Sequence, residues 1–144
     1  MENIDLNYIC TTIGNLARMP IRIFQNSAQI FYRSVVYLPK DPITAFRDEI
    51  LAVDSHVSYF VTPYFHYYGI LNSGEYKIII GPTFQVKQSD QTLRELAFLC
   101  DVTKDETKEF LDGMHSILPM PLDSILQILC VVNYIVNNEK LTIN

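Results

Sequence analysis

The chain has 144 residues, of which 49% are hydrophobic, 12% aromatic and 19% charged. This length suits a single domain, and the apolar content is too high for a disordered chain. Eleven Lys and Arg against sixteen Asp and Glu give a net charge of -5, the wrong sign for a surface that binds nucleic-acid phosphates. The sequence therefore predicts one compact domain over residues 1–144, with no nucleic-acid binding of its own.

The cysteines and the apolar stretches predict where the chain resides. Cys10, Cys100 and Cys130 are odd in number and far apart, so they indicate neither a disulfide framework nor a zinc ribbon. The longest apolar stretch, Ile125–Val136, is too short to cross a bilayer, and the N-terminus has no signal-peptide pattern. We expect a cytoplasmic protein without a membrane partner.

Two kinds of hydrophobic periodicity alternate along residues 1–88. Apolar residues between Leu6 and Ala17 recur at helical spacing, and Pro20 ends this helix. Asp41 followed by Pro42 predicts the start of a second helix, which reaches about Asp54. The remaining runs are rich in β-branched and aromatic residues and predict five strands, Ile21–Gln25, Gln29–Tyr37, Val57–Pro63, Phe65–Asn72 and Tyr76–Ile80.

The last of these strands sets the predicted topology. Ile78–Ile80 is apolar on both faces, which is typical of a strand inside a sheet, and Gly81-Pro82 predicts where it ends. Because neighbouring hairpins pair, it should lie beside Ile21–Gln25, which gives an antiparallel sheet of strand order 2-1-5-4-3. Residues 89–144 form a C-terminal helical segment, with predicted helix starts at Ser89, Thr103 and Pro121. The predicted fold is therefore α+β.

Enzyme and metal signatures are missing from the sequence. The five glycines are scattered, so no phosphate-binding loop is predicted, and the three histidines lack partners at ligand spacing. Residues 93–111 imitate a DNA-binding helix-turn-helix, but the second helix is acidic, which favours a packed helical hairpin. We expect no enzyme, no cofactor and no metal site.

An aromatic cluster on neighbouring strands is the densest feature of the chain. Its rings could simply fill the core, or they could wall a pocket between the sheet and the second helix. For a small-molecule pocket, the candidates for polar contacts are Tyr59, His66 and Tyr68. Arg22 could add a charged contact if its side chain points inward.

The last helix carries an apolar stripe with steps of 3, 4, 3 and 4 residues. Its members are Leu122, Ile125, Leu129, Val132 and Val136. Such a stripe suits helix pairing in a homodimer, and it equally suits packing against the chain's own sheet. Both alternatives stay open at this point, and a broad stripe could serve both.

Five segments carry a resemblance to a known family. They are residues 19–24, 59–63, 68–71, 78–82 and 117–119. The order of elements resembles PAS-like and GAF-like sensor domains. In detail, the chain resembles the N-terminal regulatory domain of AraC-type transcriptional regulators of low-GC Gram-positive bacteria, including regulators of YSIRK-targeted surface antigens. The resemblance implies a dimeric sensor domain, with DNA bound by a C-terminal helix-turn-helix domain that these residues do not contain.

Three functions are therefore weighed. The first is a regulatory sensor and dimerisation domain, which binds a small molecule or transmits a signal. The second is a protein-interaction or dimerisation module with a filled core and no ligand. A stand-alone enzyme is the least favoured, since it would need convergent titratable groups.

Overall fold

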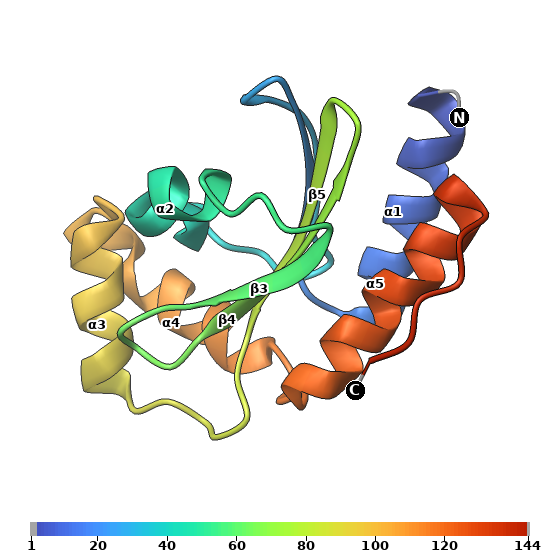
Figure 1. Ribbon diagram of the computed structural model, residues 1–144. Helices are drawn as coiled ribbons and strands as arrows, with labels where there is room; N and C mark the ends of the chain where they lie inside the picture. The colour runs from blue at the N-terminus through green and yellow to red at the C-terminus, as the bar shows by residue number, and fades with distance from the viewer. Residues whose placement is uncertain (1–2, 144) are drawn as a thin grey trace.

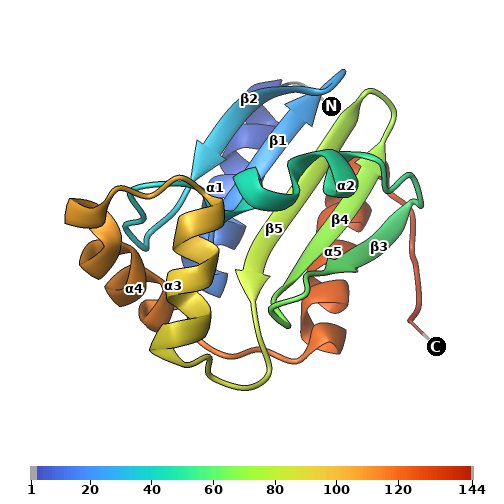
Figure 2. The same cartoon turned by 90° about the vertical axis from the view of Figure 1, so that its left-hand side faces the viewer.

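The computed structural model describes residues 3–143, with side chains from residue 5 onward. The described chain is an α+β domain built on one five-stranded antiparallel sheet of order β2-β1-β5-β4-β3 (Figures 1 and 2). The predicted class and strand order are confirmed. The strands are β1 (Ile21–Gln25), β2 (Ala28–Arg33), β3 (Val57–Val61), β4 (Tyr67–Ser73) and β5 (Tyr76–Thr83).

Four strands, β2 to β5, have ends that differ from the prediction, and the larger differences have local reasons. β2 stops before Tyr37 because Ser34 Oγ accepts from Val36 N (3.1 Å) and turns the chain off the sheet. β3 and β4 are shortened by a tight turn, in which Thr62 N donates to His66 O (2.8 Å). β5 runs past Gly81-Pro82 to Thr83, because Gly81 N donates to Pro20 O (2.8 Å) at the start of β1.

The helices begin near the predicted residues. Asp41 caps the first turn after β2, since its side chain accepts from Ile43 N. That segment is not one helix to Asp54, however, but a 3-10 turn and a short α-helix. Thr103 bonds the side chain of Glu106 rather than a backbone N–H, so a 3-10 turn precedes the next helix. The helical elements are α1 (Asn3–Ala17), η1 (Pro42–Phe46), α2 (Arg47–Leu51), α3 (Asp90–Leu99), η2 (Lys104–Glu106), α4 (Thr107–Ser116) and α5 (Leu122–Asn137).

One face of the sheet is covered by helices from the two ends of the chain. α1 and α5 lie side by side there (Figures 1 and 2). Their inner sides pack on alternate strand residues that point to this face, including Ile23, Leu71 and Ile78. Because a strand exposes alternate residues to opposite faces, the same strands supply a second core on the other side.

The opposite face is crossed by η1 and α2. Phe24, Ile70 and Ile79 meet Ile43 and Ile50 there in a smaller core. α3 and α4 pack together beyond the edge of this layer, and α3 also contacts η1. Figure 2 shows the sheet between the α1/α5 layer behind and α2 in front.

Candidate functional site

The four predicted ligand-contacting residues do not converge on one pocket. Arg22 and Tyr68 point to the α2 face, where both are fully buried. His66 lies buried in the β3–β4 turn, with its ring 5.8 Å from that of Phe84. Tyr59 is 45% exposed and lines a different hollow beside α5. These four side chains therefore do not meet in one site: Arg22 and Tyr68 share the α2 face, the pleat puts Tyr59 on the other face, and His66 lies in the turn.

The side chain of Arg22 points inward, but its guanidinium is already paired with the carboxylate of Asp41. Its Nε and Nη2 donate to Asp41 Oδ2 and Oδ1 at 2.8 and 2.7 Å, a two-pronged ion pair. Its guanidinium also lies 5.6 Å from the ring of Tyr68 and 5.8 Å from that of Tyr32. Burial alone would lower the pKa of Arg22, but Asp41 outweighs it, so the pKa is raised. Arg22 thus fixes η1 to the sheet and is not accessible to a ligand.

His66 is held neutral by its surroundings. Burial lowers its pKa to about 4, because the charged imidazolium would lose its hydration. Its Nε2 is buried and has no hydrogen-bond partner within the described residues. At neutral pH the side chain therefore acts as a packed aromatic ring against Phe84.

The predicted dimer stripe of α5 is used inside the domain. Ile125, Leu129 and Val132 are buried against β3 and β4, and Leu122 and Val136 pack half-buried at the margins of the same core. Gly69 on β4 permits this close approach, because a Cβ there would come within 2.9 Å of Leu129 Cδ1. Of the two predicted alternatives, packing against the chain's own sheet describes these five residues. They belong to the core of the domain and not to an exposed dimer interface.

Two of the three cysteines, Cys10 and Cys100, are buried thiols with raised pKa values. Burial raises the pKa of Cys10 to about 12 and that of Cys100 to about 11, so both thiols stay protonated. Among residues 3–143, no three His, Cys, Asp or Glu side chains gather closely enough to hold a metal ion.

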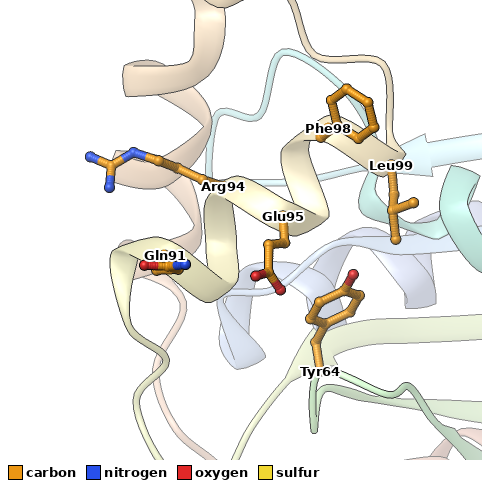
Figure 3. Close-up of a pocket in the computed structure, with 6 residues that line it drawn as sticks. All are labelled: Tyr64, Gln91, Arg94, Glu95, Phe98 and Leu99. Atoms are coloured by element: carbon orange, nitrogen blue, oxygen red, sulfur yellow. The ribbon is translucent and has the colours of Figure 1, made fainter.

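A surface cleft lies between α3 and the β3–β4 turn (Figure 3). We call it the α3 cleft, and its volume is about 450 Å³. One side is the ring of Tyr64, and the carboxylate of Glu95 points toward this ring. Arg94 extends away from both groups. Its lining residues are Tyr64, Gln91, Arg94, Glu95, Phe98 and Leu99.

Both walls of the α3 cleft are firmly held. Tyr64 N donates to Thr62 Oγ1 (3.2 Å), and the Tyr64 ring lies 6.3 Å from Phe46, which in turn lies 6.2 Å from Phe60. On the other side, Ser89 caps α3 by accepting from Thr92 N. The buried side of α3 is anchored in the large core. The backbone on both sides of the cleft is therefore held in place, while the α3 side chains that line it are exposed.

The sequence prediction missed this cleft because its two walls are distant in the chain. Tyr64 belonged to the predicted aromatic cluster, but nothing in its spacing points to α3. Phe98 gave a signal in the sequence, because this large aromatic residue lies between Leu96 and Cys100 of the predicted buried side of the helix. Phe98 is 81% exposed in the structure, which is unusual for a phenylalanine ring.

A second surface feature is the side of α1 and α5 that faces away from the sheet. We call it the outer face; its exposed large apolar residues are Tyr8, Leu16, Val131, Tyr134 and Ile135. The exposed charged residues of the two described helices are Asp5 and Asp123. Surface helices normally expose charged and polar residues, and low charge with Tyr enrichment is typical of protein interfaces.

Comparisons of the chain with protein families, with curated proteins and with solved structures return no match. In the described part of the chain, no helix has both the length and the apolar character needed to cross a bilayer.

Proposed function

We propose that the chain is a regulatory sensor and dimerisation domain of a bacterial transcription factor. The sheet order and the sequence of elements are those expected for a PAS-like or GAF-like domain, and the resemblance to AraC-type regulators supports the assignment. In this proposal the protein acts in the cytoplasm, and DNA is bound by a helix-turn-helix domain outside these 144 residues.

The outer face of α1 and α5 is the observation that carries the proposal. Val131 and Ile135 are 53% and 48% exposed on α5, one turn apart, and α1 beside them exposes Tyr8. A second copy would cover these side chains by an isologous helix-on-helix contact. Each fully buried Val or Ile side chain contributes about 1.5–3 kcal/mol before the cost of association.

The arrangement also suggests how a signal would pass. The α3 cleft opens beyond the sheet face that η1 and α2 cross, and α5 packs on the other face. A change at the β3–β4 turn would reach α5 through β4, which contacts it directly. A small shift or rotation of α5 in a dimer would alter the spacing of two attached DNA-binding units.

Sedimentation velocity at micromolar concentration tests the dimer. We expect the wild-type chain to sediment as a dimer, and Val131→Glu with Ile135→Glu to sediment as a folded monomer. The matched control is Val86→Glu, which places the same charge at a 74% exposed valine outside α1 and α5. A wild-type monomer, or dissociation by Val86→Glu alone, would refute the outer face as the interface.

A second candidate function is a protein-interaction module without a ligand. The specific observation in its favour is the filled α2 face, where Arg22, Asp41 and Tyr68 occupy the space that a buried sensor ligand would take. The two candidates differ in whether a small molecule binds to the chain, and a titration on the α3 cleft distinguishes them.

A further inference from the structure

We infer that the α3 cleft binds the cationic head of a small alkylamine or alkylguanidine. Binding itself does not depend on the proposed function, and only its role as a regulatory signal rests on that function. The volume of the α3 cleft, about 450 Å³, lies within the usual range for small-molecule sites.

The lining of the α3 cleft holds one acidic and one basic side chain, Glu95 and Arg94. The Glu95 carboxylate points toward Tyr64, whereas Arg94 extends away from it (Figure 3). The side chain of Glu95 has no ion pair or hydrogen bond to any other residue in the part of the chain that the structure describes. Asp90, five residues earlier in α3, already pairs with His115 at 2.6 Å. Glu95 is therefore the carboxylate that a cation in this cleft would meet.

The remaining groups favour a cation with N–H donors. A cation beside Glu95 would also lie near the Tyr64 ring, whose face attracts positive charge. The amide oxygen of Gln91 and the hydroxyl of Tyr64 can accept hydrogen bonds, as the carboxylate does. A primary ammonium or a guanidinium satisfies such acceptors, whereas a quaternary ammonium cannot donate to them.

The apolar part of the ligand is assigned to the upper wall. Leu99 lies beside Glu95 and points toward the Tyr64 hydroxyl, whereas the Phe98 ring lies above them and is directed away from Tyr64 (Figure 3). Phe98 and Leu99 are 81% and 46% exposed. A short alkyl chain running from Glu95 toward these side chains would cover part of this apolar surface. The ligand class is therefore a monocation with a short alkyl arm.

NMR titration of the full chain with n-butylguanidinium and n-butylammonium tests the assignment. We expect chemical-shift changes centred on residues 62–66 and 91–99. The neutral isostere n-butylurea should bind at least about ten-fold more weakly, since it lacks the charge that Glu95 recognises. Equal binding of n-butylurea, or shifts centred elsewhere, would overturn the inference.

Substitutions separate the roles. Glu95→Gln should weaken n-butylguanidinium binding roughly five-fold, as expected for one solvent-exposed charged hydrogen bond. Phe98→Ala should weaken butyl more than methyl derivatives. The matched control is Glu109→Gln, which neutralises an exposed glutamate on α4 outside the cleft. Equal affinity of Glu95→Gln and the control would overturn the inference.

Two sources of the cation are distinguished by a capped Ala-Arg-Ala peptide. We expect it to bind no better than n-butylguanidinium, as for a free small molecule. At least ten-fold tighter binding would overturn the small-molecule source and assign the cleft to an arginine side chain of a protein. Sedimentation of the same samples shows whether the chain is still a dimer. If ligand binding is absent while the dimer is intact, the proposed ligand is refuted and the proposed dimer is not.

Discussion

Neutralising Asp41 should destabilise the domain strongly, because it leaves the buried charge of Arg22 without a partner. Asp41→Asn keeps the size of the side chain and an oxygen that can still accept from Ile43 N, so the cap of η1 survives. The charge partner of Arg22 is lost, although Arg22 is fully buried. Removing one member of a buried ion pair costs about 3–5 kcal/mol.

The magnitude is set by how buried the pair is. The side chain of Asp41 is 19% exposed, so water can solvate part of the site and we expect about 2–3 kcal/mol. Total stabilities are about 5–15 kcal/mol, so this loss is a large fraction, and it should lower the melting temperature by roughly 5–10 °C. Urea unfolding followed by circular dichroism measures it.

A double-mutant cycle isolates the ion pair. Arg22→Met removes the buried charge and keeps apolar volume beside Tyr68. The double variant should be more stable than the sum of the two single changes predicts, by about 2 kcal/mol. A free energy of unfolding for Asp41→Asn within 1 kcal/mol of the wild-type value (about five-fold in equilibrium constant) would show that the ion pair does not stabilise the domain as described.

Three further changes have directions that follow from the structure. Gly69→Ala should cost about 1–3 kcal/mol in chemical unfolding, since its Cβ would lie 2.9 Å from Leu129 Cδ1 and 3.2 Å from Ile80 Cγ2; unchanged stability would contradict the close approach of α5 to β4. Leu129→Ala should cost about 2–4 kcal/mol and Val131→Ala less than about 0.5 kcal/mol in the monomer, and equal losses would contradict the assignment of inner and outer sides of α5. Wild-type stability should fall by up to about 3 kcal/mol as the pH falls from 6.5 to about 4, because the unfolded chain binds a proton at His66 that the folded chain excludes; His66→Phe should remove this part of the acid dependence, and an unchanged acid limb would refute it.

The topology could be predicted because its signals are local. The three consecutive isoleucines at Ile78–Ile80 predict a strand that is buried on both faces and therefore lies inside the sheet. In the structure β5 pairs with β1 on one side and β4 on the other. Asn26 and Ser27 broke the pattern between β1 and β2, and both adopt left-handed conformations that suit a tight hairpin. Adjacent hairpins then left few alternatives.

The site could not be predicted in the same way, because it depends on which elements meet. The spacing of the α5 stripe is the same whether it meets a sheet or a second helix. The close approach of Ile125 and Leu129 to β4 depends on the glycine at position 69, which the spacing of the stripe does not reveal. Arg22 alternates with Ile21 and Ile23, a pattern typical of a surface position. Its burial follows from Asp41, nineteen residues away, arriving on the same face. The α3 cleft joins Tyr64 to a helix that begins at Asp90.

The distance between two copies of α5 shows whether the outer face forms the dimer interface. A spin label at Gln127→Cys lies on the outer face. Cys10 and Cys100 are fully buried, and Cys130, which lines the hollow beside α5, is replaced by serine in the labelled protein. Since packed helices lie about 8–10 Å apart, the dimer should give a dipolar distance below roughly 35 Å, and Val131→Glu with Ile135→Glu should abolish it. A dimer that shows no dipolar coupling at this position, or a coupling unaffected by both substitutions, would contradict dimerisation through the outer face.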